Sequence, residues 1–349
     1  MNTFLTTTLA TLVVLVSSIA SADDRTAISA DNPNIHQRGD FSDLKRKLTV
    51  DKKAHVGFIG GSITANAGGH TAMVPAWFRK NYPEVEFTFT NAGISSTCST
   101  SGAFRLKNDL LSKGKLDLLI VEFAVNDDQD AGHNHENCVR GMEGIIRQLK
   151  QHNPAAAIVM VHYVNPGMLA MLQAGNTPIS ISAHHKTAEH YNVTEVNLAA
   201  EIANNAKAGK YSWQDYGGTH PNKFGYEIAS NMITAALAGR LESKNTVADS
   251  SALPKPIDAY NYGNGRFIEI SDAKLAGDWK QGKVTRDLLP IGGIRNSFSS
   301  YECLRGNIPG DTLTLEFTGR TVGAFILAGP DAGIVSSKID GAEALSHDL

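Results

Sequence analysis

The sequence has few cysteines and little net charge, and each shortage excludes a class of protein. Its 349 residues include only three cysteines, which are Cys98, Cys138 and Cys303. That is too few for a disulfide framework, although one bridge between an unspecified pair stays possible. The net charge is −3, without a basic stripe for nucleic acid or a polybasic cluster for an anionic membrane. We therefore expect a small-molecule or glycan partner and no nucleic acid, and the sequence leaves the oligomeric state open.

Long apolar runs are also missing, apart from one near the N-terminus. Residues 5–16 form an apolar run that is too short for a stable membrane anchor. Ala20-Ser21-Ala22 follows it, which is a small-residue pattern typical of signal-peptide cleavage. We therefore predict a signal peptide over residues 1–22. The mature protein is expected to be periplasmic or extracellular, without membrane insertion after cleavage.

The middle of the chain alternates between strand-like and helix-like segments. Apolar runs at residues 55–59, 116–125 and 157–164 are typical of buried strands, and residues 138–151 have apolar positions at helical spacing. Repeated strand–helix units predict a parallel sheet with helices on both faces. The sequence therefore predicts an α/β domain over residues 51–242, preceded by an N-terminal extension over residues 23–50.

The character of the sequence changes after this domain. Residues 243–262 are rich in Ser, Ala, Pro and Asn, which predicts a linker. Beyond it, strand-like segments at residues 266–270, 312–317 and 321–327 are separated by Gly, Pro and Asp turns. We expect residues 263–349 to form a small sandwich-like β-rich domain that is either incomplete or unusually short.

Two polar turns follow predicted strands of the α/β domain. Ser62 follows Gly60-Gly61 directly after the first strand, where a helix N-terminus favours a developing negative charge. Ser62 is thus a candidate nucleophile, and the alternative is a simple helix cap. The second turn is Asn91-Ala92-Gly93, in which Gly93 could offer its backbone N–H to a bound group or form an ordinary turn.

Two further loops carry candidate catalytic residues. Asn126 ends the most apolar strand, and its side-chain amide could donate to a developing oxyanion or form an Asx-turn. His220 lies in Thr219-His220-Pro221-Asn222, just before the closing helix predicted over residues 223–237. It is a candidate general base for a serine, and the alternative is a surface histidine. Because the carboxyl ends of parallel strands share one edge, all four residues together favour a single site.

These four motifs resemble the blocks of the SGNH/GDSL hydrolases, over roughly residues 56–237. Gly-Gly-Ser-Ile-Thr is similar to the first block, with Gly61 in place of the family's Asp, and Asn-Ala-Gly matches the second. Ala-Val-Asn-Asp is similar to the third block, with Ala124 in place of Gly, and Thr-His-Pro-Asn matches the fourth. The resemblance implies a flavodoxin-like three-layer α/β/α fold and ester hydrolysis without a metal or cofactor. It also implies Ser62 as nucleophile, His220 as base, and an oxyanion hole formed by Ser62, Gly93 and Asn126.

One position departs from the family pattern. The family usually has an Asp three residues before the catalytic histidine, whereas this chain has Gly217 there. Asp215 is the nearest carboxylate in sequence and is our candidate for orienting the imidazole. Otherwise a backbone carbonyl orients His220 and the site is a Ser–His dyad.

A competing cluster follows the third-block motif. Asp127, Asp128, Asp130, His133 and His135 could hold a divalent metal, but their spacing matches no closed zinc or EF-hand pattern. The sequence favours a solvated loop without a metal. It also favours surface positions for His184, His185 and His190, which lie in a polar helical stretch.

The sequence therefore predicts a serine esterase that cleaves short acyl esters, such as O-acetyl groups on carbohydrates, through an acyl-serine intermediate. A lipase, arylesterase or thioesterase of the same fold is the alternative within this class. The alternative outside it is a catalytically silent glycan-binding protein, which the missing Asp before His220 favours.

Overall fold

The computed structural model describes residues 24–243, 253–289, 291–295, 298–299, 301–306, 308–330 and 332–349. The predicted signal peptide lies outside these residues, as do residues 244–252 of the predicted linker. Within the described chain, no helix has the length and apolar character that crossing a bilayer requires.

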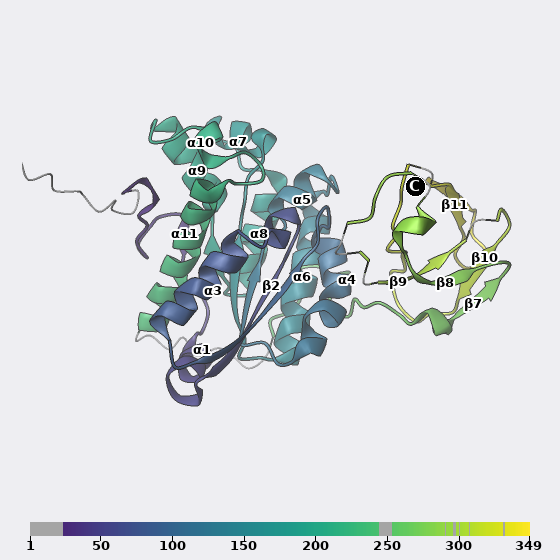
Figure 1. Ribbon diagram of the computed structural model, residues 1–349, viewed down its shortest axis with the longest axis horizontal. Helices are drawn as coiled ribbons and strands as arrows, with labels where there is room; N and C mark the ends of the chain where they lie inside the picture. The colour runs from purple at the N-terminus through teal and green to yellow at the C-terminus, as the bar shows by residue number, and fades with distance from the viewer. Residues whose placement is uncertain are drawn as a thin grey trace, which may run out of the picture.

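A six-stranded sheet forms the centre of the α/β domain (Figure 1), in the order β1-β6-β5-β4-β2-β3. Five strands are mutually parallel: β2 (Lys53–Gly60), β3 (Glu86–Gly93), β4 (Leu118–Val121), β5 (Ala157–Val161) and β6 (Thr194–Val196). Numbered along the chain, these five strands follow the order 2-1-3-4-5, which is the flavodoxin-like doubly wound topology. The structure confirms the predicted fold.

Helices cover both faces of the sheet and produce three layers (Figure 1). On one face lie α3 (His70–Asn81), α9 (Leu198–Lys207) and α11 (Lys223–Glu242), and on the other lie α4 (Ser99–Asp109), α6 (His135–His152) and α8 (Ile179–His190). All side chains of β4 and β5 are buried between these layers, as their continuous apolar sequences predict. The remaining helices are α1 (Ser42–Arg46), α2 (Ser62–Ala65), α5 (Ala124–Gln129), α7 (Pro166–Gln173) and α10 (Trp213–Tyr216), with short η segments at Asp24–Thr26, Lys47–Asp51, Leu111–Lys113, Ile270–Asp272 and Arg286–Leu288.

The predicted N-terminal extension is part of this domain. Its strand β1 (Ile35–His36) pairs antiparallel with β6 at the edge of the sheet. Leu44 and Leu48 from the same segment are fully buried in the core. The extension therefore contributes to the stability of the α/β domain, because burying two leucines is worth about 3–6 kcal/mol.

The C-terminal region contains three two-stranded antiparallel sheets, which confirms that it is strand-rich. They pair β7 (Ala273–Ala276) with β10 (Thr312–Leu315), β8 (Lys280–Lys283) with β9 (Glu302–Arg305), and β11 (Ile334–Ser337) with β12 (Leu345–Asp348). The strands expected at residues 266–270 and 321–327 are absent. Val322, Phe325, Ile326 and Leu327 stay 37–45% exposed, so their apolar sequence finds no partner strand.

Residues of the predicted linker pack against α6. Glu143 accepts hydrogen bonds from the backbone N–H groups of Ile257 and Asp258, at 2.6 and 3.0 Å. Arg140 forms an ion pair with the Asp258 carboxylate at 2.8 Å. The described part of this segment is therefore fixed to the α/β domain by buried polar contacts.

Candidate active site

Ser62 and His220 meet at the edge of the sheet where the parallel strands end. Strand β2 ends at Gly60, and Ser62 is the first residue of α2. His220 lies in the loop between α10 and α11. Ser62 Oγ and His220 Nε2 are 2.7 Å apart although 158 positions separate them in sequence. This is the hydrogen-bond contact that a serine nucleophile and its base require.

Asn126 lies directly beneath the serine turn, in the first turn of α5. It is only 2% exposed. A methyl group added at Gly61 would come within 2.0 Å of Asn126 Oδ1, so in this chain the Asn126 side chain packs closely against the Gly61 backbone. Asn126 Nδ2 donates to Asp130 Oδ2 at 2.6 Å. Because an amide nitrogen carries two hydrogens, one remains for a substrate oxygen.

Gly93 ends β3 and pairs with Gly60 of β2. A methyl group added at Gly93 would lie 2.3 Å from the Ala65 backbone nitrogen, so only glycine allows α2 to approach this closely. The Gly93 N–H already donates to Asn91 Oδ1 at 2.8 Å, and Asn91 Nδ2 donates to the Thr64 carbonyl at 2.9 Å. The Gly93 N–H, which is the predicted oxyanion donor, therefore lies next to the turn that carries Ser62. It is already hydrogen-bonded to the Asn91 side chain of its own loop.

The structure does not bring Asp215 to His220. Asp215 Oδ2 accepts from both the backbone N–H and the hydroxyl of Ser212 at 2.8 Å, which forms the capping box of α10. Gly217, at the family's Asp position, has φ +101°, and a methyl group there would lie 2.2 Å from the Asn222 backbone nitrogen. In the part of the chain that the structure describes, Ser62 is the only hydrogen-bond partner of the His220 ring.

Glu122 is a residue of the site that the sequence analysis missed. It follows β4 and is fully buried, and its Oε1 accepts from Gly61 N at 3.0 Å, Thr64 N at 3.3 Å and Thr64 Oγ1 at 2.6 Å. Burial raises the pKa of Glu122 to about 7, despite the opposing effect of these hydrogen bonds. The visible signal was a carboxylate near the end of the apolar run Leu116–Val125, which also contains Asp117 near its start.

Arg105 is the second missed residue, and it holds the same turn from the other side. Its side chain is fully buried, and its guanidinium donates to the carbonyl oxygens of Ala92 at 2.5 Å and Gly60 at 3.0 Å. Asp109 balances the charge at 2.8 Å. The guanidinium thus fixes the ends of β2 and β3, next to Ser62 and Gly93. One arginine in an ordinary helical segment gave no sequence signal.

The segment after β4 is only partly the solvated loop that the sequence favours, because residues 129–132 are exposed whereas Asp127 lies inside α5. Asp127 is fully buried and accepts from Ser99 N and Ser99 Oγ, both at 2.7 Å, and from His184 Nε2 at 2.9 Å. Although burial opposes ionisation, the close approach of His133 at 3.4 Å and the hydrogen bond from His184 lower the pKa of Asp127 to about 2. His184 is also fully buried, because its ring donates to the Asp127 carboxylate. The predicted surface position of His184 is therefore wrong.

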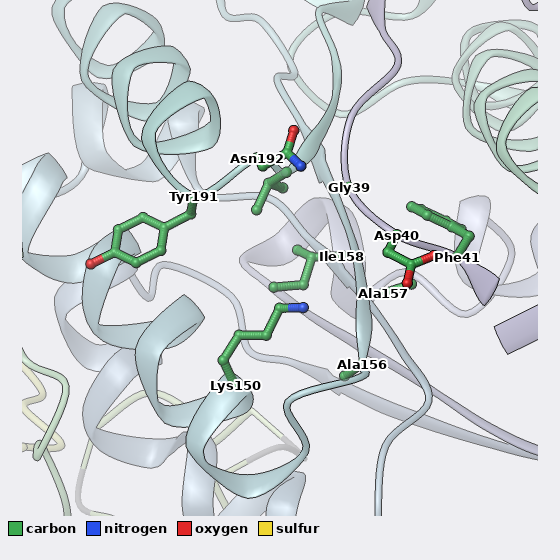
Figure 2. Close-up of a pocket in the computed structure, with 10 residues that line it drawn as sticks. Gly39, Asp40, Phe41, Lys150, Ala156, Ala157, Ile158, Tyr191 and Asn192 are labelled. Carbon is green, nitrogen blue, oxygen red and sulfur yellow. The ribbon is translucent and has the colours of Figure 1, made fainter. Parts of the chain in front are cut away.

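A small hollow elsewhere in the domain is not part of this site (Figure 2). Ala156, Ala157 and Tyr191 are among the residues that line it. Ala157 begins β5, whereas Ser62 follows the end of β2, and the strands are parallel. The hollow therefore lies at the opposite end of the sheet from Ser62 and His220. A second, open hollow includes Asp215 and Phe224 and lies beside α10 and α11.

Comparison with known proteins identifies the family of the α/β domain. Residues 58–228 match the model of the GDSL-like lipase/acylhydrolase family. The α/β domain belongs to this family. All four sequence motifs of the GDSL domain, from Ser62 to His220, fall within the matched residues. No match is found among curated protein sequences.

Solved structures of a two-domain esterase resemble most of this chain. A crystal structure of a two-domain esterase (CEX) active on acetylated mannans is 26% identical, covers 72% of this chain and 63% of that chain, and has a TM-score of 0.56. The same esterase co-crystallised with mannopentaose is 26% identical, covers 70% of this chain and 65% of that chain, and has a TM-score of 0.58. This chain thus spans just under two thirds of the length of that esterase.

Proposed function

We propose that this chain is an exported serine esterase that hydrolyses O-acetyl and other short acyl esters on carbohydrates. The observation that carries the proposal is the 2.7 Å contact between Ser62 Oγ and His220 Nε2. It occurs in a GDSL-like domain, beside an amide and a glycine N–H at the same edge of the sheet.

In the proposed acylation step, Ser62 Oγ bonds to the acyl carbon while its proton passes to His220 Nε2. The carbonyl oxygen becomes an oxyanion close to the N-terminus of α2. The Ser62 N–H and one Asn126 Nδ2 hydrogen stabilise it. The Gly93 N–H contributes when its hydrogen bond shifts from Asn91 Oδ1 to the oxyanion. His220 then returns the proton to the leaving sugar oxygen as the ester bond breaks.

Deacylation repeats these roles with water. A water molecule gives one proton to His220 Nε2 and its oxygen bonds to the acyl carbon. Collapse of the second oxyanion returns that proton to Ser62 Oγ and releases the carboxylic acid. We propose a Ser–His dyad without Asp215, because that carboxylate is held by Ser212.

Support for a carbohydrate substrate comes from the similarity to the esterase that is active on acetylated mannans. That similarity extends over about 70% of this chain, beyond the 171 residues that the family model matches. We propose an acetylated polysaccharide as the substrate, with mannan as the first to test.

The experiment compares wild type with Ser62→Ala and His220→Ala, with Ser182→Ala, an exposed serine on α8, as a matched control. The first assay measures acetate released from acetylated mannan and from acetylated xylan. Hydrolysis of p-nitrophenyl acetate and of p-nitrophenyl palmitate is compared to measure acyl-chain preference. Labelling by a fluorophosphonate probe identifies the nucleophile. We expect each catalytic variant to lose about 10⁴-fold or more in kcat and the control to keep full activity.

The outcomes separate the alternatives. If palmitate is cleaved faster than acetate, the protein is a lipase and the carbohydrate proposal is wrong. If neither labelling nor hydrolysis depends on Ser62 while the protein retains acetylated mannan on an affinity gel, the glycan-binding alternative is correct.

A further inference from the structure

Asp127 and four other side chains of metal-binding type lie close together, on the face of the sheet that α4 and α6 cover. They come from separate segments: Cys98 precedes α4, Asp127 lies in α5, His133 precedes α6, Cys138 lies in α6 and His184 in α8. Ligand atoms of Cys98, Asp127 and His133 lie within 4.8 Å of one another, and so do those of Asp127, Cys138 and His184. Asp127, Cys138 and His184 are each fully buried.

Hydrogen bonding leaves several of these ligand atoms incompletely satisfied. His133 Nδ1 is buried without a hydrogen-bond partner and lies 3.4 Å from Asp127 Oδ1. The Cys98 and Cys138 sulfurs make only the long, weak hydrogen bonds usual for sulfur, at 3.8 Å to Ser101 Oγ and 4.0 Å to the His133 carbonyl among the described residues. Buried polar atoms in proteins normally have partners, so an unpartnered imidazole nitrogen beside a carboxylate and two thiols needs an explanation.

The Asp127 carboxylate has a free position on the side of His133. Its Oδ2 accepts from Ser99 Oγ and His184 Nε2, whereas its Oδ1 accepts only from Ser99 N. One lone pair of Oδ1 therefore remains toward His133 Nδ1. Ligating carboxylates are commonly held by such outer hydrogen bonds, which here come from Ser99 and His184.

We propose that Cys98, Asp127, His133 and Cys138 bind a zinc ion, with His184 positioning the carboxylate. Two thiolates, an imidazole and a carboxylate are ligands that zinc prefers in closed four-coordinate sites. Ligand atoms about 2.0–2.3 Å from a tetrahedral zinc lie roughly 3.3–3.8 Å from each other. The two groups of three share Asp127, so binding by all four residues requires the Cys98 and Cys138 side chains to turn toward one ion beside that carboxylate. The ion would join the start of α4, the α5 turn that carries Asn126, and α6.

The first test measures metal in the full-length protein, purified without chelator from cells supplied with zinc. We expect about one zinc ion per chain by elemental analysis. Replacement by cobalt should give thiolate-to-cobalt charge-transfer absorption together with visible d–d bands of a tetrahedral site. Neither measurement needs a variant or depends on esterase activity, so both stand apart from the proposed function.

Variants then locate the ion. Cys98→Ser, Cys138→Ser and His133→Ala should each retain less than about a tenth of the wild-type zinc. Cys303→Ser, which alters the remaining cysteine in the C-terminal region, should retain all of it. The proposal is wrong if the wild-type protein carries no zinc, if its zinc content is the same in Cys98→Ser and Cys138→Ser, or if peptide mapping of the non-reduced protein shows a Cys98–Cys138 disulfide.

Discussion

Glu122 links the ionisation of a buried carboxylate to the turn that carries Ser62. Its Oε1 receives three hydrogen bonds from that turn, which favour the ionised form, whereas complete burial disfavours it. Burial dominates and raises the pKa from 4.5 to about 7. In the unfolded chain the carboxyl is exposed and titrates near its ordinary value. Folding therefore takes up a proton at pH values between these two pKa values.

The sign of the pH dependence follows from this uptake. Between pH 4.5 and 7 the folded protein binds more protons at Glu122 than the unfolded chain, so the free energy of unfolding falls as pH rises. A difference of about 2.5 pKa units corresponds to about 3 kcal/mol in total, because each unit is worth 1.36 kcal/mol. Roughly 2.5 kcal/mol of this change falls between pH 5 and pH 8.

The perturbation is Glu122→Gln, which keeps an oxygen acceptor for Gly61 and Thr64 but does not titrate. Urea unfolding of both proteins, monitored by circular dichroism at pH 5, 6, 7 and 8, measures the stability difference directly. We expect the variant to gain about 2.5 kcal/mol relative to wild type from pH 5 to pH 8. Comparing the two proteins cancels the titration of other groups. A difference that stays constant over this range would refute the reasoning, because it would mean that Glu122 has the same pKa in both states.

Three further predictions concern the residues around Ser62. Replacing Arg105 by Met leaves the Gly60 and Ala92 carbonyls without their donor, and we expect a loss of about 3 kcal/mol in urea unfolding together with reduced kcat. For Asn126→Ala, kcat with p-nitrophenyl acetate should fall about 10²–10³-fold with little change in KM, and an unchanged kcat would remove this residue from the oxyanion hole. The Asp215→Asn change should lower kcat less than tenfold, whereas loss of an orienting carboxylate costs about 10⁴-fold elsewhere, so a decrease of that size would show that Asp215 acts on His220.

Sequence patterns predicted the fold because its elements have strong local signals. The buried strands β4 and β5 are continuous apolar runs, and the turns that follow β2 and β3 carry glycine. Ser62 and His220 could be predicted as partners because the carboxyl ends of parallel strands share an edge. Their contact distance depends on how the long closing segment packs, which a local pattern does not encode.

Residues whose role depends on three-dimensional contacts were harder to predict. Arg105 occupies an unremarkable helical position, and only the fold brings its guanidinium to two strand ends. His184 has polar neighbours in sequence, yet it is buried because Asp127 lies opposite it. Asp215 was predicted to orient His220 because the two residues are close in sequence. In the structure its carboxylate accepts a hydrogen bond from the Ser212 hydroxyl instead. Hydrogen bonds between distant segments are what sequence spacing alone does not predict.

The proposed nucleophile and the proposed base are held in different ways, and this difference bears on the proposed mechanism. Two buried side chains hold the turn that carries Ser62 from within the core. Glu122 accepts hydrogen bonds from N–H groups of the turn, and Arg105 donates to the Gly60 carbonyl just before it. His220, in contrast, lies exposed on a loop with two left-handed glycines, Gly217 and Gly218, just before it. The precision that catalysis requires therefore lies on the serine side. The proposed dyad needs an imidazole that can shift between Ser62, the leaving oxygen and water, because one nitrogen must serve all three in turn, and the exposed position of His220 is consistent with that need.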